Sequence, residues 1–167
     1  MEIGLSLGVN QGDRLAALRQ ARQHLDALSA TRVLDVSPIY ETDPVDVAPE
    51  FSALSFYNTV AILESGLEIS ELARRLHAIE RTMGRTGAGP RNAPRPIDID
   101  LIYAGALVLQ TLELTLPHPR WAQRRFVVQP LADVRPDLII PGHRDTVSAI
   151  AKRLTDPAGV RRISDRW

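Results

Sequence analysis

Apolar residues recur with the period of a strand in some segments of this chain and with the period of a helix in others. Ile3, Leu5, Leu7 and Val9 alternate with small or polar residues, which is typical of a strand buried on one face. Apolar residues three and four positions apart in 69–83 predict an amphipathic helix. The same two patterns predict a further helix over 13–28 and further strands over 32–41, 57–63 and 97–103.

This order of elements limits the fold. The succession β-α-β-β-α-β is typical of an α+β, ferredoxin-like core, in which an antiparallel sheet carries both helices on one face. The opposite face stays free, and we expect the active site there. Beyond this core, 107–116 predicts another strand, and 119–125 and 146–154 predict short helices. Residues 137–167 otherwise carry little signal, and Arg161 and Arg162 are interpreted as surface residues.

Length and composition exclude several classes of protein. The 167 residues, 44% of them apolar, suit one globular domain over 1–167. No apolar run reaches the roughly 18 residues that a membrane span needs. The chain has no cysteine, which excludes thiol catalysis and thiolate-bound metals, and its net charge is zero, which predicts no general attraction to nucleic acid. We expect a cytoplasmic protein, a monomer, that acts on small molecules and not on nucleic acid or membranes.

Two acidic residues stand side by side on the predicted strand 97–103. Because side chains alternate along a strand, Asp98 and Asp100 share one face, while Ile97, Ile99 and Tyr103 are expected on the other. Neighbouring carboxylates repel each other, so the pair suits a site for a cation, and magnesium takes a few carboxylates together with substrate phosphates. The alternative is an edge strand whose acids face water.

Basic and aromatic residues surround this acidic pair in the sequence. Arg85, Arg91 and Arg95 lie in the Gly- and Pro-rich segment 84–96, and guanidinium groups bind phosphates well. An equally open interpretation pairs each arginine with a surface carboxylate. Phe56 and Asn58 suit stacking and edge recognition of a flat heterocycle, although core packing explains any single aromatic residue. No phosphate-binding glycine motif is present.

Taken together, these segments make the chain similar to a known family. It resembles the 6-hydroxymethyl-7,8-dihydropterin pyrophosphokinases of folate biosynthesis over residues 7 to about 136. The segments that carry the resemblance are 94–102 (PRPIDIDLI), 116–120 (LPHPR) with Arg124, Phe126 and Pro130, and the shorter stretches 7–10, 37–42 and 79–85.

The resemblance implies an activity and its cofactors. Members of this family transfer a pyrophosphoryl group from ATP to the hydroxymethyl oxygen of a reduced pterin and release AMP. It also implies two magnesium ions held by Asp98 and Asp100, with ATP as the co-substrate.

The resemblance further assigns roles to residues of this chain. The implied catalytic residues are Arg85, Arg91, Arg95, Asp98 and Asp100. The implied ATP-binding residues are Glu80, Arg85, Arg95, Ile99, His118 and Arg124. The implied pterin-binding residues are Thr42, Pro44, Val45, Phe56, Asn58, Asp98 and Phe126, with the two phenylalanines enclosing the ring.

Two alternative functions are also compatible with the same fold. An RRM-like nucleic-acid-binding module also uses the free face of such a sheet, but it needs aromatic and basic residues where this chain has two aspartates. An inactive partner domain would be expected to lack one of the metal- or phosphate-binding residues, and none is missing.

Overall fold

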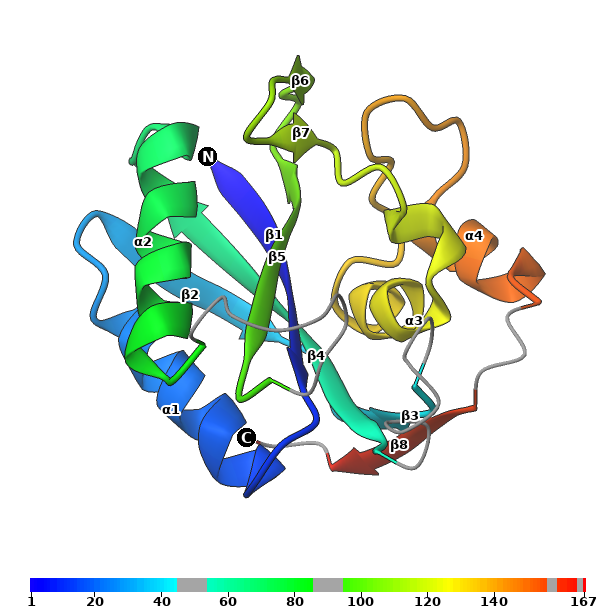
Figure 1. Cartoon of the computed structure of the whole chain (residues 1–167). Helices are drawn as coiled ribbons and strands as arrows, with labels where there is room; N and C mark the ends of the chain where they lie inside the picture. The colour runs from blue at the N-terminus through cyan, green and yellow to red at the C-terminus, as the bar shows by residue number, and fades with distance from the viewer. Residues whose placement is uncertain (45–53, 86–94, 156–158, 165–166) are drawn as a thin grey trace.

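An antiparallel sheet runs through the middle of the molecule, with helices on both sides of it (Figure 1). The computed structural model describes residues 1–44, 54–85, 95–155, 159–164 and 167. The strand order is β5-β1-β4-β3-β8, and β2 also pairs with β4. The strands of this sheet are β1 (Glu2–Val9), β2 (Thr31–Val36), β3 (Ile39–Thr42), β4 (Phe56–Ser65), β5 (Asp98–Ala104) and β8 (Val160–Ser164). This arrangement confirms the α+β, ferredoxin-like fold class.

The first core lies between the sheet and helices α1 (Arg14–Asp26) and α2 (Ile69–Thr82). The alternating residues of β1, from Ile3 to Val9, are all buried in it, as the sequence predicts. Leu18 of α1 and Leu76 of α2 are buried against them. Asp13 caps α1, because its side chain accepts a hydrogen bond from the backbone N–H of Ala16 at 3.0 Å. Burial of apolar surface therefore holds both helices on this face.

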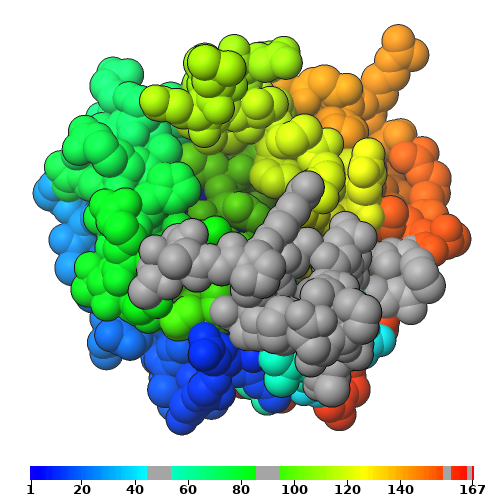
Figure 2. Space-filling view, in the orientation of Figure 1, coloured from blue at the N-terminus to red at the C-terminus, as the bar shows by residue number. Residues whose placement is uncertain are grey.

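A second core lies on the opposite face of the sheet. Helices α3 (Arg125–Val134) and α4 (Val147–Arg153) pack there against Val60 and Ile62 of β4, which alternate with residues of the first core. This is the face expected to be free, and the two helices cover part of it. The uncovered part forms a hollow between α2 and α3 with β5 at its floor (Figure 2).

Strand β5 contains a bulge, which changes the face of the sheet on which the side chains after it lie. Gly4 of β1 pairs with Tyr103, but Leu5 pairs with Leu101, so Ile102 is the extra residue. Tyr103 consequently lies in the second core and not beside Leu101, and the expectation that it shares a face with Ile99 is wrong. The Tyr103 hydroxyl donates a hydrogen bond to Glu2 at 2.7 Å.

Other elements differ from the sequence expectations. The predicted strand 32–41 is interrupted at Ser37-Pro38 into β2 and β3, because proline has no N–H to donate. The segment 107–116 forms a short hairpin, β6 (Leu109–Gln110) and β7 (Thr115–Leu116). A 3-10 helix, η2 (Trp121–Gln123), replaces the predicted helix 119–125, whereas α4 confirms the helix expected over 146–154. Helix α3 and strand β8 were not predicted.

Gly4 is predicted to be irreplaceable by alanine. A Cβ atom at this position would lie 2.2 Å from Cε1 of Tyr103, so Gly4→Ala must displace a buried ring. We expect the free energy of unfolding, measured by urea denaturation, to fall by about 1–3 kcal/mol. Gly66→Ala is the matched control, because its Cβ would meet only the carbonyl oxygen of Ala30, at 3.9 Å. Equal stability of the two variants would contradict the packing described here.

Candidate active site

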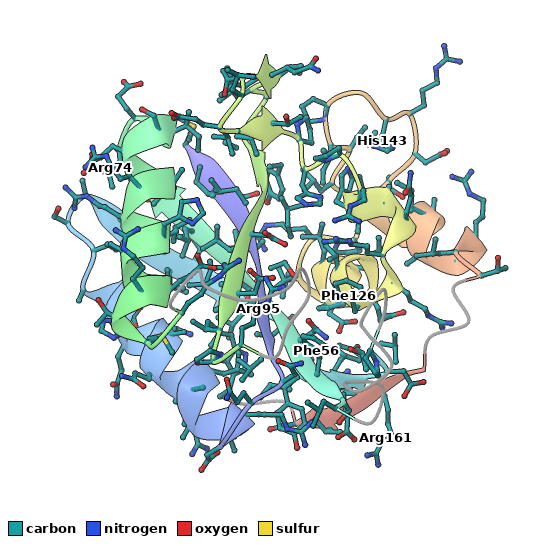
Figure 3. The ribbon with its side chains drawn as sticks, viewed as in Figure 1. Phe56, Arg74, Arg95, Phe126, His143 and Arg161 are labelled. Carbon is teal, nitrogen blue, oxygen red and sulfur yellow. The ribbon has the colours of Figure 1, made fainter. Side chains whose placement is uncertain are left out.

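A pocket opens where β1, β3, β4 and β5 face the start of α3. One end of the pocket carries acidic and basic side chains, and the other end carries aromatic ones. Figure 3 shows Arg95, Phe56 and Phe126 gathered around it. The lining residues are Ser6, Gly8, Thr42, Asp43, Phe56, Asn58, Arg95, Asp98, Asp100, Arg124 and Phe126. Of the residues predicted for the site, the fold thus brings eight together from four separate segments.

The floor of the pocket depends on small residues of β1. Ser6 and Gly8 alternate with the buried leucines and point to the pocket side of the sheet. A Cβ atom on Gly8 would lie 2.9 Å from Oδ1 of Asn58, so a larger residue would displace a pocket side chain. Sequence reasoning gave these two residues no role, although small residues alternating with apolar ones were a visible signal.

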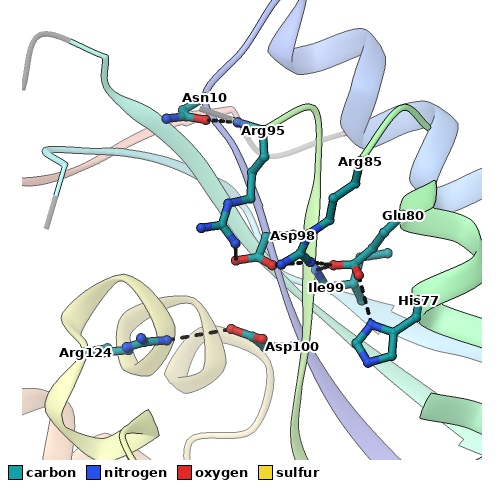
Figure 4. A network of polar contacts seen from close by, with 9 residues as sticks. All are labelled: Asn10, His77, Glu80, Arg85, Arg95, Asp98, Ile99, Asp100 and Arg124. Carbon is teal, nitrogen blue, oxygen red and sulfur yellow. Dashed lines mark hydrogen bonds and ion pairs between the residues drawn. The ribbon is translucent and has the colours of Figure 1, made fainter. Parts of the chain in front are cut away.

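The two aspartates of β5 line the pocket, although β5 is the terminal strand of the sheet. Oδ1 of Asp98 accepts a hydrogen bond from Arg85 at 2.7 Å, and Oδ2 accepts one from Arg95 at 3.1 Å (Figure 4). Asp100 lies 3.7 Å from Nη1 of Arg124. Each aspartate therefore has a guanidinium partner, although both remain partly exposed at the edge of the sheet.

The surroundings of Asp100 disfavour its charged form. Burial raises its pKa, and the negative charge of Asp98 raises it further, to about 6, while Arg124 acts in the opposite direction. A charged Asp100 thus costs folding free energy in the absence of a further cation. This is the electrostatic condition that a bound metal ion would relieve.

Glu80 is a buried residue that binds two groups next to the acidic end of the pocket. Its side chain is only 2% exposed, and its Oε1 accepts hydrogen bonds from the Ile99 N–H at 2.8 Å and from Arg85. Its Oε2 contacts His77 Nδ1 at 3.0 Å. Burial lowers the pKa of Arg85, but Asp98 and Glu80 outweigh burial and hold that pKa above its usual value. Glu80 therefore joins α2, Arg85 and β5.

Arg95 is fixed through its backbone as well as its side chain. Its N–H donates a hydrogen bond to Oδ1 of Asn10 at 2.9 Å, and Asn10 is only 5% exposed. Asn10 follows the end of β1, so it ties the start of β5 to the neighbouring strand. Nothing local in the sequence marks Asn10 for this role, because only the tertiary structure brings it to Arg95.

The other end of the pocket is flat and apolar, with a buried amide at its edge. Phe56 begins β4, and Phe126 lies in the first turn of α3 with the Arg124 guanidinium 5.5 Å from its ring centre. The side chain of Asn58 is buried, and its Nδ2 donates a hydrogen bond to Oγ1 of Thr42 at 2.6 Å. This end can stack a planar ring and offer hydrogen bonds to its rim.

The remaining predicted residues lie outside the pocket lining or outside the described residues. The pKa of His118 is lowered to about 4. Burial is the larger cause, and the positive charge of Arg124 is the next. The side chain of Ile99 is in the first core, and its N–H is bound to Glu80. Pro44 does not line the pocket. Arg91 and Val45 lie outside the described residues.

The acidic pair fits a magnesium ion by its chemistry. No group of three or more histidine, cysteine or acidic side chains able to hold a metal occurs within residues 1–44, 54–85, 95–155 and 159–164. Magnesium does not need such a group, since it binds through one or two carboxylates and completes its octahedron with water and substrate phosphates. Asp98 and Asp100 provide these two carboxylates beside arginines able to bind the phosphates.

Comparison with known families decides the relationship. Residues 4–136 match the model of the 7,8-dihydro-6-hydroxymethylpterin-pyrophosphokinase family. The chain belongs to this family. The match includes every described residue that lines the pocket and ends just beyond α3.

Individual relatives agree with the family assignment. The 2-amino-4-hydroxy-6-hydroxymethyldihydropteridine pyrophosphokinase of Bacillus subtilis is 38% identical over 78% of this chain and 75% of the relative. The enzyme of that name from Pseudomonas aeruginosa is 34% identical over 88% of each. The folic acid synthesis proteins of Schizosaccharomyces pombe and Pneumocystis carinii are also similar, but the chain spans only 18% and 20% of their length.

Solved structures share the fold at low sequence identity. A Plasmodium falciparum HPPK-DHPS structure superimposes with a TM-score of 0.73 and 13% identity, and the match covers 91% of this chain and 42% of that one. A likeness at this identity supports the fold of the pyrophosphokinase family.

Glu80 is predicted to stabilise the folded protein as well as to hold Arg85 in place. Glu80→Ala leaves the Ile99 N–H without its acceptor and Arg85 without one buried partner, so we expect a loss of about 2–4 kcal/mol in unfolding free energy. Glu80→Gln retains an oxygen for Ile99 and should lose less. Urea denaturation of both variants measures the difference, and equal losses would show that the hydrogen bond to Ile99 is unimportant.

His118 is predicted to make stability depend on pH below neutrality. Its folded pKa of about 4 lies below its ordinary value of 6.5, so the unfolded chain binds more protons between these values. This contribution is present above pH 6.5 and is lost as the pH falls towards 4. His118→Asn should reduce the slope of the melting temperature against pH in this window. An unchanged slope would exclude a buried, neutral His118.

Proposed function

We propose that this protein transfers a pyrophosphoryl group from ATP to the hydroxymethyl oxygen of 6-hydroxymethyl-7,8-dihydropterin, forming AMP in folate synthesis. The observation that carries this proposal is the two-ended pocket. One end combines Asp98 and Asp100 with three guanidinium groups, and the other places Phe56 and Phe126 beside a buried amide. The reaction joins a polyphosphate to a flat heterocycle, and so needs both ends.

Two magnesium ions are part of this proposal. Asp98 and Asp100 would hold them, and the raised pKa of Asp100 supports a cation at this place. When bound, the ions neutralise the triphosphate and polarise the bond that breaks. Arg85, Arg91 and Arg95 complete the proposed catalytic set, with Arg91 assigned from the family resemblance alone.

The protein's own part in the reaction is alignment and charge compensation. Arg85, Arg95 and Arg124 would bind phosphate oxygens, with Glu80 holding Arg85 in place. His118, neutral because of its lowered pKa, would act as an uncharged hydrogen-bond donor to ATP. Ile99 would contribute to the ATP site through its backbone, since its side chain is buried in the core. Phosphoryl transfer depends mainly on such positioning and electrostatic stabilisation.

The aromatic end would hold the pterin. Phe56 and Phe126 would enclose the ring, while Asn58 and the backbone from Thr42 through Pro44 to Val45 would bind its polar rim. Asp98 would lie between this ring and the phosphates, since it lines the pocket together with both phenylalanines. The short distance between Asn58 and Thr42 supports a rim that is ordered before the substrate arrives.

The domain organisation and partners complete the proposal. We infer one domain over 1–167, which is supported by two cores that share a single sheet. The partners would be the substrates ATP and the pterin. The protein would act on them as a cytoplasmic monomer. No helix in the described part of the chain is long and apolar enough to cross a membrane. The nucleic-acid-binding and inactive-partner alternatives receive no support from the family assignment.

The decisive experiment is an assay for AMP with the purified protein. AMP should form when ATP, magnesium and 6-hydroxymethyl-7,8-dihydropterin are all present, and it should be absent when any of the three is omitted. Transfer of a pyrophosphoryl group gives AMP and the pterin diphosphate, whereas simple hydrolysis of ATP would release AMP or ADP without the pterin. AMP formation independent of the pterin would refute the proposal.

Asp100→Asn separates the catalytic role of this residue from a structural one. Loss of the carboxylate should reduce AMP formation by at least about 100-fold, because a metal ligand and its electrostatic effect are removed. The unfolding free energy should stay equal or rise, because burial and Asp98 disfavour the charged side chain. Parallel measurements of AMP formation and urea denaturation test both expectations. Full activity of the variant would remove Asp100 from the metal site.

A further inference from the structure

The C-terminal strand β8 begins at the pterin side of the pocket. It lies beyond residues 4–136, which match the family model, and it forms the edge of the sheet next to β3 (Figure 1). The pairing runs from Ile39 opposite Ser164 to Thr42 opposite Val160. Thr42 lines the pocket and accepts the hydrogen bond of Asn58. The strand therefore borders the wall that is proposed to bind the pterin rim.

Two hydrogen bonds join Gly159, which directly precedes β8, to the next pocket residue, Asp43. The Asp43 N–H donates to the carbonyl oxygen of Gly159 at 3.1 Å, and the Gly159 N–H donates to Oδ2 of Asp43 at 2.9 Å. Asp43 is thus held through both its backbone and its side chain. One carboxylate oxygen is directed to Gly159, which fixes how the Asp43 side chain lies in the pocket wall.

Gly159 is required for this close approach. A Cβ atom on Gly159 would lie 2.8 Å from Oδ2 of Asp43, closer than real Cβ contacts. Any larger residue must therefore displace the Asp43 carboxylate from this position. Because Gly159 itself is exposed, the fold as a whole does not depend on its packing.

A second link between β8 and the pocket runs through Glu41. Its carboxylate is paired with Arg161 of β8, and it accepts hydrogen bonds from Arg14 of α1 at 3.3 Å and from the Ser55 hydroxyl at 2.9 Å. Ser55 directly precedes Phe56. Arg161 is 76% exposed, and exposed ion pairs contribute little, so this second link is a weak constraint.

We propose that β8 positions the pterin-binding wall of the pocket, and that Gly159 is the positioning residue that holds Asp43 in it. This inference rests on the proposed function. It assigns β8 a role in pterin affinity and no role in the bond-breaking step, because the contacts of Gly159 go to Asp43 and not to the acidic pair.

Steady-state kinetics with the full chain test this proposal. Gly159→Ala should raise the KM for the dihydropterin about three- to tenfold, the effect of losing about one hydrogen bond. The kcat and the KM for ATP should change less than twofold. Gly66→Ala, at the far end of β4, is the matched control and should leave all three values unchanged. An unchanged pterin KM in Gly159→Ala would overturn the proposal.

A double-mutant cycle distinguishes positioning of Asp43 from general destabilisation. Gly159→Ala should have no further effect on pterin KM in an Asp43→Ala background, because the contact is already absent. Asp43→Asn should raise KM less than Asp43→Ala, since the amide oxygen can still accept the Gly159 N–H. Equal fold-changes from Gly159→Ala in both backgrounds would show that Gly159 does not act through Asp43.

Equilibrium binding separates this inference from the proposed function. Calorimetric titration of the dihydropterin, in the presence of magnesium and a non-hydrolysable ATP analogue, measures affinity without turnover. If the wild-type protein binds the pterin but forms no AMP, the proposed reaction fails, and the Kd values of the same variants still decide the role of Gly159. If the wild-type protein does not bind the pterin, both proposals are overturned.

Discussion

Two carboxylates on neighbouring outward positions of β5 set the electrostatic problem that the rest of the site solves. Asp98 and Asp100 point to the same side of the strand, and burial of one of them makes its negative charge costly. Three arginines from different parts of the chain reduce this cost. Arg85 follows α2, Arg95 precedes β5 and Arg124 precedes α3, so the charge balance exists only after these elements have assembled.

The two cores explain how an edge strand can carry such a charged site. Ile97, Ile99 and Leu101 are buried against the first core, and the bulge at Ile102 turns Tyr103 into the second. Apolar burial on both faces thus anchors β5 at either side of its acidic residues. Glu80 adds a polar anchor, because its buried carboxylate binds a backbone N–H of β5 and the side chain of Arg85. A rigid strand keeps the two aspartates at a fixed separation.

The predictability of these features from sequence follows the range of the interactions that produce them. The shared face of Asp98 and Asp100 and the buried face of β1 depend on local alternation, and both are confirmed. The apolar run beginning at Phe126 has no clear period, so nothing local distinguished helix α3 from a strand. The bulge needs Gly4 opposite Tyr103, and β8 needs β3 as a partner. The first pair lies 99 positions apart, and the pairs of β3 with β8 lie 118 to 125 positions apart.

The same distinction separates the two ends of the pocket. Part of the acidic end is local in sequence, since Arg95, Asp98 and Asp100 lie within six residues, whereas Arg85 and Arg124 come from other elements. The aromatic end is assembled from β3, β4 and α3, and its outer wall is bordered by β8, which the family match does not reach. In this chain the two aspartates thus owe their shared face to local alternation, whereas the wall around Thr42 and Asp43 depends on long-range pairing with the segment 159–164.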